Sequence, residues 1–207
     1  MKKVIRLALW GVFVLSTIAI AYYAFSYFDF NVKNLLHAKG ELVNRRIYQI
    51  GFYGHIFFGA RALLIGPWQF MQGIRTKKMS LHRLLGKAYV AACIFSGLAG
   101  LYIAQYASTG MVARLGFSAL AILWLFTTIR AFTSIRQLKV VAHQMWMFRS
   151  YALTFAAVTL RIQLGISEGL GLDFDVAYPL ISWSCWVPNL VLVELIWVQK
   201  MKKPKFV

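Results

Sequence analysis

Long runs of hydrophobic residues alternate along this chain with short segments that carry most of its charge. A helix of about 20 apolar residues crosses a bilayer core of about 30 Å, and six runs reach this length. The predicted spans are Leu7 to Phe28, Ile47 to Phe70, Ala88 to Ser108, Met111 to Ile135, Gln144 to Ile166 and Tyr178 to Gln199. The pattern therefore predicts an all-α fold, a polytopic membrane helix bundle of six transmembrane helices that form a single transmembrane domain, residues 1–207.

The first span begins like a secretory signal. Basic residues precede its apolar run, and Ala19 and Ala21 resemble the small residues of a cleavage site. The run continues beyond Ala21 through Tyr22 and Phe25, which makes it long enough to span. We therefore expect an uncleaved first helix. Cleavage, the alternative, would leave five helices in the same orientation.

The basic residues set the orientation of the spans, because Lys and Arg accumulate on the cytoplasmic side of membrane proteins. With the N-terminus inside, the inner segments hold fifteen of them and the outer segments five. Both termini are therefore predicted to be cytoplasmic. The inner residues are Lys2, Lys3, Arg6, Arg75, Lys77, Lys78, Arg83, Lys87, Arg130, Arg136, Lys139, Lys200, Lys202, Lys203 and Lys205, and the outer ones are Lys33, Lys39, Arg45, Arg46 and Arg114.

Composition supports the membrane prediction and narrows the choice of function. Hydrophobic residues make up 60% of the chain, charged residues make up 14%, and the mean hydropathy is +0.63, whereas a soluble domain has about 25% charged residues. The net charge of +17 would suggest nucleic acid for a soluble protein. Here the cations lie between apolar runs, so no nucleic-acid partner is expected. Cys93 and Cys185 both fall inside apolar runs, which predicts no disulfide framework.

A few charged residues fall inside the predicted spans, where they are costly unless they are paired or functional. Counted at 1.5 Å per residue, Arg61, Arg149 and Glu194 each lie about 7 to 14 Å from the inner face. One carboxylate between two guanidiniums predicts an ion pair that staples three helices together. The surplus arginine supports a second interpretation, a site for a haem propionate, a quinone oxygen or a lipid phosphate. His55 lies in the outer half of its span.

Two histidines begin helices at the inner face, His82 before the third span and His143 before the fifth. Two imidazoles at one level on different helices can ligate a single haem iron from opposite sides. Histidine beside basic residues at an interface is also ordinary, so both interpretations stay open. The other candidate cofactor-binding residues are His55, Arg61 and Arg149, whereas His37 in the outer loop is expected to be solvated.

Small residues recur at every fourth position of the third span. Such a ladder lets helix backbones approach closely, which predicts a tightly packed central helix. A shallow groove for a flat prosthetic group or a lipid-like ring is the alternative. The ladder consists of Ala88, Ala92, Ser96, Gly100, Ala104 and Ser108.

Four motifs follow one another along the chain, namely His55 to Phe70, His82 to Tyr89, His143 to Ser150 and Trp186 to Leu190. Their combination resembles the bacterial membrane proteins of the DUF2306 family over roughly residues 47 to 199. The resemblance implies a multi-pass helical protein of the bacterial cytoplasmic (inner) membrane, and it implies no activity.

A more distant similarity is to b-type cytochromes and ferric reductase-like membrane domains. It is carried by His82, Arg83 and Gly86, and it implies a haem ligand at His82. This chain departs from the two-haem pattern, because none of its helices carries two histidines at the spacing of two haems. The histidines therefore allow at most one b-type haem, held by His82 and His143, and the alternative is no cofactor.

These observations favour a small integral membrane protein that transfers electrons, with a haem or quinone site near the cytoplasmic face and a redox protein as partner. The main alternative is a non-catalytic assembly or accessory protein, in which the histidines, arginines and Glu194 serve packing. A small transporter is the third possibility. Hydrolytic chemistry is not expected, because the chain has neither a Ser-His-Asp arrangement nor a His-Glu-x-x-His pair.

The charge count makes a testable prediction about topology. Reporter fusions placed after Lys78, after Lys139 and at Val207 should report a cytoplasmic location, because these positions lie in or next to the basic inner segments. A fusion after Asp173 should report an external location. A cytoplasmic signal from the Asp173 fusion would show that the number of spans is wrong.

Overall fold

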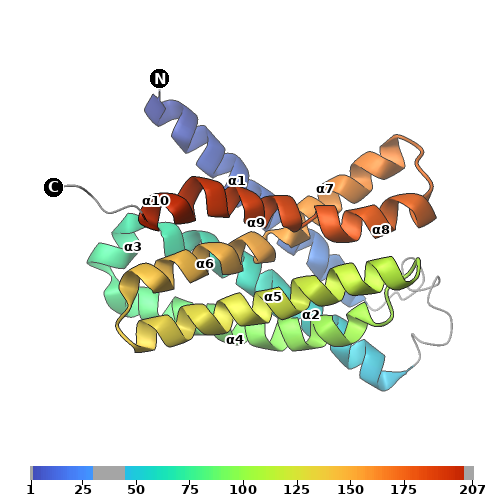
Figure 1. Ribbon diagram of the computed structural model, residues 1–207, viewed down its shortest axis with the longest axis horizontal. Coiled ribbons are helices and arrows are strands. Elements are labelled where there is room, and N and C mark those ends of the chain that lie inside the picture. Colours follow the sequence, from blue (N-terminus) through green and yellow to red (C-terminus); the bar gives the residue numbers. More distant parts are fainter. Residues whose placement is uncertain (1, 30–44, 203–207) are drawn as a thin grey trace.

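All regular structure in the described residues, 2–29 and 45–202 of the computed structural model, is helical (Figure 1). The class predicted from the hydrophobic pattern, all-α, is therefore confirmed. In chain order the elements are α1 (Lys2–Phe25), η1 (Ser26–Asp29), α2 (Arg46–Phe70), α3 (Gln72–Lys77), α4 (Met79–Ala104), α5 (Met111–Arg136), α6 (Val140–Thr154), α7 (Ala156–Gly169), α8 (Phe174–Ser184), α9 (Val187–Val193), η3 (Glu194–Val198) and α10 (Gln199–Lys202).

Four stretches of the described residues are long and apolar enough to cross a membrane, namely Leu7–Phe28, Met79–Ala104, Met111–Arg136 and Phe174–Val198. Large apolar side chains also cover the outer surface of these helices, as Leu7, Leu15 and Trp197 illustrate, so they face lipid rather than water. The two other predicted spans correspond to α2 and to the α6–α7 pair. Their crossing of the membrane, and with it the six-span topology, stays a prediction.

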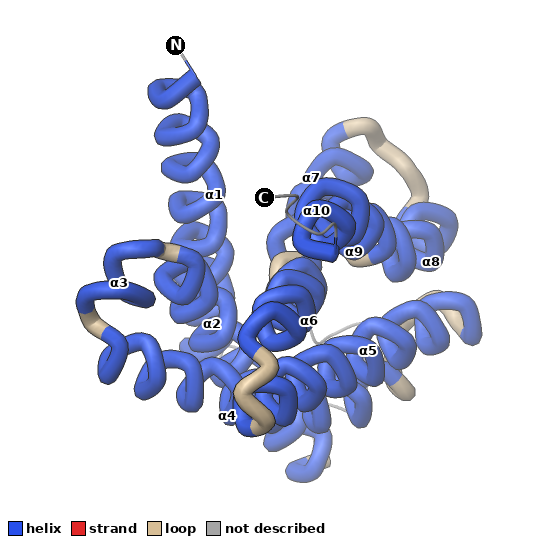
Figure 2. Tube along the Cα trace, turned by 60° about the vertical axis from the view of Figure 1, so that its left-hand side comes forward, coloured by secondary structure: helices blue, strands red, loops and turns tan. Residues whose placement is uncertain are grey.

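The bundle centre is formed by α2, α4, α5 and α6. The closest packing joins α2 to α4, α4 to α5, and α5 to α6, and these helices run side by side in Figure 1. Figure 2 shows α1 standing apart from the bundle over its N-terminal half. The short α3 links α2 to α4 at one end of the molecule, the end predicted to be cytoplasmic.

The helical segment formed by α8 and α9 is broken at Cys185 and Trp186, and side chains of α7 and α9 bond the backbone groups there. Pro188 has no N–H to donate to the carbonyl of Ser184, and that carbonyl instead accepts from Gln163 Nε2 at 3.2 Å. The Cys185 carbonyl likewise accepts from Asn189 Nδ2 at 3.0 Å and from Thr159 Oγ1. Side chains of α7 and α9 therefore satisfy the backbone groups that the α8–α9 break leaves free.

Glycine allows the close approach of α2 to α6. A Cβ atom at Gly66 would lie 1.8 Å from Cε2 of Tyr151. The Tyr151 hydroxyl donates to the carbonyl of Leu63 at 3.0 Å, one turn earlier on α2. One edge of the aromatic ring therefore lies against the α2 backbone, in a space that only glycine leaves open.

We predict that Gly66→Ala lowers the melting temperature in detergent by several degrees, because Tyr151 must leave its position and its hydrogen bond to Leu63. Gly54→Ala on the same helix is the matched control, since a Cβ there meets nothing within 4 Å and alanine favours helix by about 1 kcal/mol. Differential scanning fluorimetry measures both. Equal melting temperatures for the two variants would contradict this packing.

Candidate functional site

His143 lies in the first turn of α6, and one nitrogen of its imidazole is hydrogen-bonded to the backbone. Its Nδ1 is 2.9 Å from the carbonyl of Ala131 on α5. A carbonyl can only accept, so Nδ1 carries the proton and Nε2 keeps a free lone pair. Burial lowers the pKa of His143, although the hydrogen bond to Ala131 opposes this. The imidazole is therefore neutral at pH 7, which is the form that binds metals.

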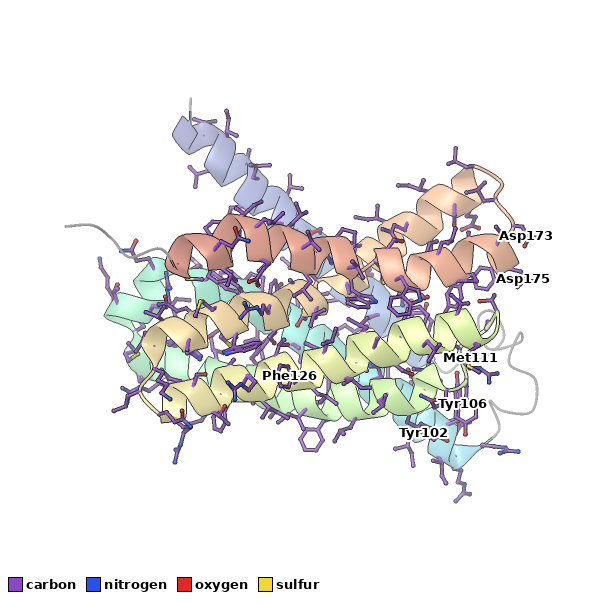
Figure 3. All side chains as sticks on the ribbon, viewed as in Figure 1. Tyr102, Tyr106, Met111, Phe126, Asp173 and Asp175 are labelled. Atoms are coloured by element: carbon purple, nitrogen blue, oxygen red, sulfur yellow. The ribbon has the colours of Figure 1, made fainter. Side chains whose placement is uncertain are left out.

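His82 lies in the first turn of α4, near His143. It lies close enough to His143, Arg75 and Arg83 for a positive charge on any of them to act on its ring, so the structure brings the two predicted haem ligands to the same end of the bundle. Its Nδ1 is buried and has no hydrogen-bond partner among the described residues. The opposite end carries Tyr102 of α4, Tyr106 in the turn after it, and Asp173 and Asp175 at the start of α8, all labelled in Figure 3.

Arg149 and Glu194 form a two-pronged ion pair between α6 and η3. Arg149 Nε donates to Glu194 Oε2 and its NH2 group to Oε1, both at 2.9 Å. The guanidinium also lies over the ring of Trp146, 4.5 Å from the ring centre. With 15% and 32% of the two side chains exposed, the pair is partly buried. It joins η3, in the C-terminal helical segment, to α6 in the bundle.

Arg61 is not part of the Arg149–Glu194 ion pair. Among the residues that the structure describes it has no carboxylate within ion-pair distance, and its guanidinium lies 4.0 Å over the ring of Phe57. Depth along the spans places Arg61 level with Glu194, but depth does not say which neighbour a residue faces. Helix α2 packs mainly on α4, whereas η3 packs on α6, which carries Arg149.

Arg61 contributes the one charged side chain to a groove between α2 and α4. The groove has a volume of about 360 Å³ and is otherwise lined by Phe58, Ile65, Ala88, Ala91, Ala92 and Phe95. It does not adjoin the histidine pair. Ala91 follows His82 by nine positions, about two and a half turns, so the groove lies on the opposite face of α4.

His55 serves the packing of α2 on α4. Its Nδ1 donates to the Ser96 carbonyl at 2.9 Å, and the Ser96 hydroxyl donates back to the His55 carbonyl at 2.8 Å. A Cβ at Gly100 would lie 2.9 Å from this Nδ1. The small-residue ladder of α4 therefore has two uses, since Ser96 and Gly100 receive the imidazole while Ala88 and Ala92 line the groove.

A network of buried hydroxyl groups at the bundle centre was not predicted from the sequence. The Tyr89 hydroxyl is hydrogen-bonded to Ser150 Oγ at 2.9 Å and to Thr154 Oγ1 at 2.8 Å. Thr128 and Trp124 of α5 join the same network. Its hydroxyls recur on α6 with a spacing of four, and that spacing is the sequence signal that could have revealed it.

Two more polar residues near His82 were also missed. Gln69 at the end of α2 is 6% exposed, and the Nε atom of Arg75 in α3 is buried. Hydropathy could not place them, because the six-residue α3 leaves no periodic pattern. The glutamine between Trp68 and Phe70 was the available signal, a polar residue at the end of an apolar run. His37, expected to be solvated, lies outside the described residues.

Comparison with known proteins places the chain in a family without naming an activity. A family model described as "Predicted membrane protein (DUF2306)" matches residues 52–197. No curated protein and no solved structure matches the chain. The match covers most of the helical bundle, including both histidines of the inner end and the Arg149–Glu194 pair.

The ion pair yields a prediction about stability. Glu194→Gln should lower the melting temperature in detergent, because the half-buried Arg149 loses its carboxylate. The cost should fall between the roughly 1 kcal/mol of an exposed pair and the roughly 3 to 5 kcal/mol of breaking a fully buried one. Glu168→Gln on the exposed end of α7 is the control. If both variants melt like the unmodified protein, the pair does not stabilise the bundle.

Proposed function

The chain belongs to the DUF2306 family of predicted membrane proteins, and we propose that it is a small electron-transfer protein holding one b-type haem at the inner end of the bundle through His82 and His143. One observation carries the proposal. His143 donates its Nδ1 proton to a backbone carbonyl and keeps Nε2 free, and a second partly buried histidine lies at the same end of the bundle on another helix.

The residues around the histidines fit such a group. Metal-binding histidines commonly donate their other ring nitrogen to a carbonyl or carboxylate, which fixes the orientation of the ring. Ala131 does this for His143. Arg75 and Arg83, whose charges reach His82, would offset the negative charge of two propionates. A haem bound here would supply reversible one-electron transfer.

The groove at Arg61 supports a quinone as the redox partner in this proposal. Its aromatic and alanine walls suit a flat ring, and the guanidinium can donate a hydrogen bond to a quinone oxygen. In the predicted topology the histidines lie at the cytoplasmic side of the bacterial inner membrane. Electrons would then pass between the quinone pool and a cytoplasmic redox protein.

A non-catalytic assembly or accessory role is the competing proposal, and specific contacts favour it. The Arg149–Glu194 pair and the His55–Ser96 pair are complete within the protein. Neither needs a ligand to satisfy its polar groups, so these residues serve packing under either proposal. The two proposals differ at His82 and His143 and at the Arg61 groove.

Absorption spectroscopy distinguishes the electron-transfer proposal from the accessory proposal. Protein expressed with excess haem precursor should show a Soret band and the sharp reduced bands of a haem with two histidine ligands, at about one haem per chain. His82→Ala and His143→Ala should each abolish this spectrum, because each removes an axial ligand. His37→Ala and His55→Ala are the controls and should retain it, with circular dichroism confirming the helical content of every variant. Haem-replete protein without a Soret band would favour the accessory role.

A further inference from the structure

Buried polar atoms without a partner gather at one corner of the molecule. Within the described ranges, four buried side-chain nitrogen or oxygen atoms have no hydrogen-bond partner in the protein. Three of them belong to the end of α2, to α3 and to the start of α4. They are Gln69 Nε2, Arg75 Nε and His82 Nδ1.

The three side chains share one location. Gln69 Oε1 lies 3.5 Å from the place a Cβ would take at Gly86, and Gly86 is one helical turn beyond His82 on the same face of α4. Arg75 lies in the helix that joins α2 to α4, and its charge acts on His82. Gln69 and Arg75 therefore border the first turns of α4 together with His82.

The chemistry of the three atoms defines what can bind. The amide nitrogen of glutamine and Nε of arginine only donate hydrogen bonds, and Nδ1 of a neutral histidine can also donate. Buried donors in native proteins nearly always have an acceptor. A single group that satisfies all three must offer several acceptor oxygens, and the arginine charge favours an anion.

We propose that Gln69, Arg75 and His82 form a binding site for a phosphate group at the α2–α3–α4 corner. In the predicted topology this corner lies at the cytoplasmic interface, where lipid phosphates are found. The same segment of the chain carries further basic residues that attract anions to this end of the molecule, namely Lys77, Lys78, Arg83 and Lys87. The phosphate belongs to a lipid headgroup or is free in solution, and both sources present the same oxygens.

The phosphate site does not require the proposed haem. In the haem proposal Arg75 offsets propionate charge, but neither Gln69 nor Arg75 ligates the iron, and the phosphate site can be measured in haem-free protein. The two proposals are nevertheless compatible at His82. An oxygen that accepts from its Nδ1 would fix the ring and leave Nε2 for iron, as Ala131 does for His143.

Thermal unfolding of the full haem-free chain in lipid-free maltoside detergent provides the test. Inorganic phosphate, a short-chain phosphatidylglycerol and the matching diacylglycerol are each titrated, with chloride holding the ionic strength constant. We expect a saturable rise in melting temperature with the phosphate-bearing compounds and none with diacylglycerol. A response to both compounds identifies free phosphate as sufficient, and a response to phosphatidylglycerol alone identifies the lipid.

Variants locate the site. Arg75→Gln should weaken the response at least tenfold in apparent dissociation constant, whereas Lys77→Gln, an exposed residue of the same helix, should change it less than twofold. Gln69→Leu distinguishes binding from stability, because it removes an unpartnered buried donor. It should raise the ligand-free melting temperature and still weaken the response to phosphate.

Three results would overturn the proposal. The first is the absence of a saturable shift with either phosphate compound. The second is an equal loss of the response in Lys77→Gln and Arg75→Gln, which would mean surface charge alone. The third is stabilisation that appears only after haem loading, which would assign the three donors to a propionate. A phosphate response in the haem-free protein, together with no Soret band in haem-replete protein, would remove the haem proposal and leave this one standing.

Discussion

The constraint that governs this structure is that every backbone N–H and C=O group in a bilayer must be bonded inside the protein. Helices meet that demand wherever they are continuous. At the α8–α9 break, where Pro188 removes a donor, the demand is met by side chains from a different rod, notably Gln163 and Asn189. Polar side chains such as Gln163 and Asn189 therefore serve to bond backbone groups that the helix break leaves without a partner, so a polar residue inside an apolar span is not by itself a sign of function.

Much of the fold follows from the sequence because hydropathy reports length and depth. The predicted third span, Ala88 to Ser108, lies largely within α4, but α4 begins nine residues earlier, at Met79. The difference arises because its first two turns are basic and polar, and hydropathy cannot distinguish a polar helix from a polar loop. The break at Phe155 between α6 and α7 was missed for a related reason, since no proline or glycine marks it.

The candidate site was less accessible to sequence reasoning, because depth does not specify direction. Arg61, Arg149 and Glu194 were placed at one level, yet only Arg149 and Glu194 lie on elements that face each other. His82 and His143 were brought together because both begin helices at the same end. Depth along a span does not single out Gln69 or Arg75. The polar Gln69 at the end of an apolar run was a signal, but the absence of hydrogen-bond partners for both residues is visible only in the structure.

The hydrogen bond between Gln163 of α7 and the Ser184 carbonyl of α8 also bears on how the protein inserts into the membrane. Until α7 lies beside α8, the Ser184 carbonyl has no donor, and Gln163 has no acceptor for its amide nitrogen. The connection between these two rods is only Leu170 to Asp173, so both halves emerge from the ribosome close together. If α8 entered the lipid apart from α7, the Ser184 carbonyl would be exposed there without a hydrogen-bond donor. Membrane insertion of the C-terminal third is therefore favoured as one preassembled hairpin rather than as two helices in succession.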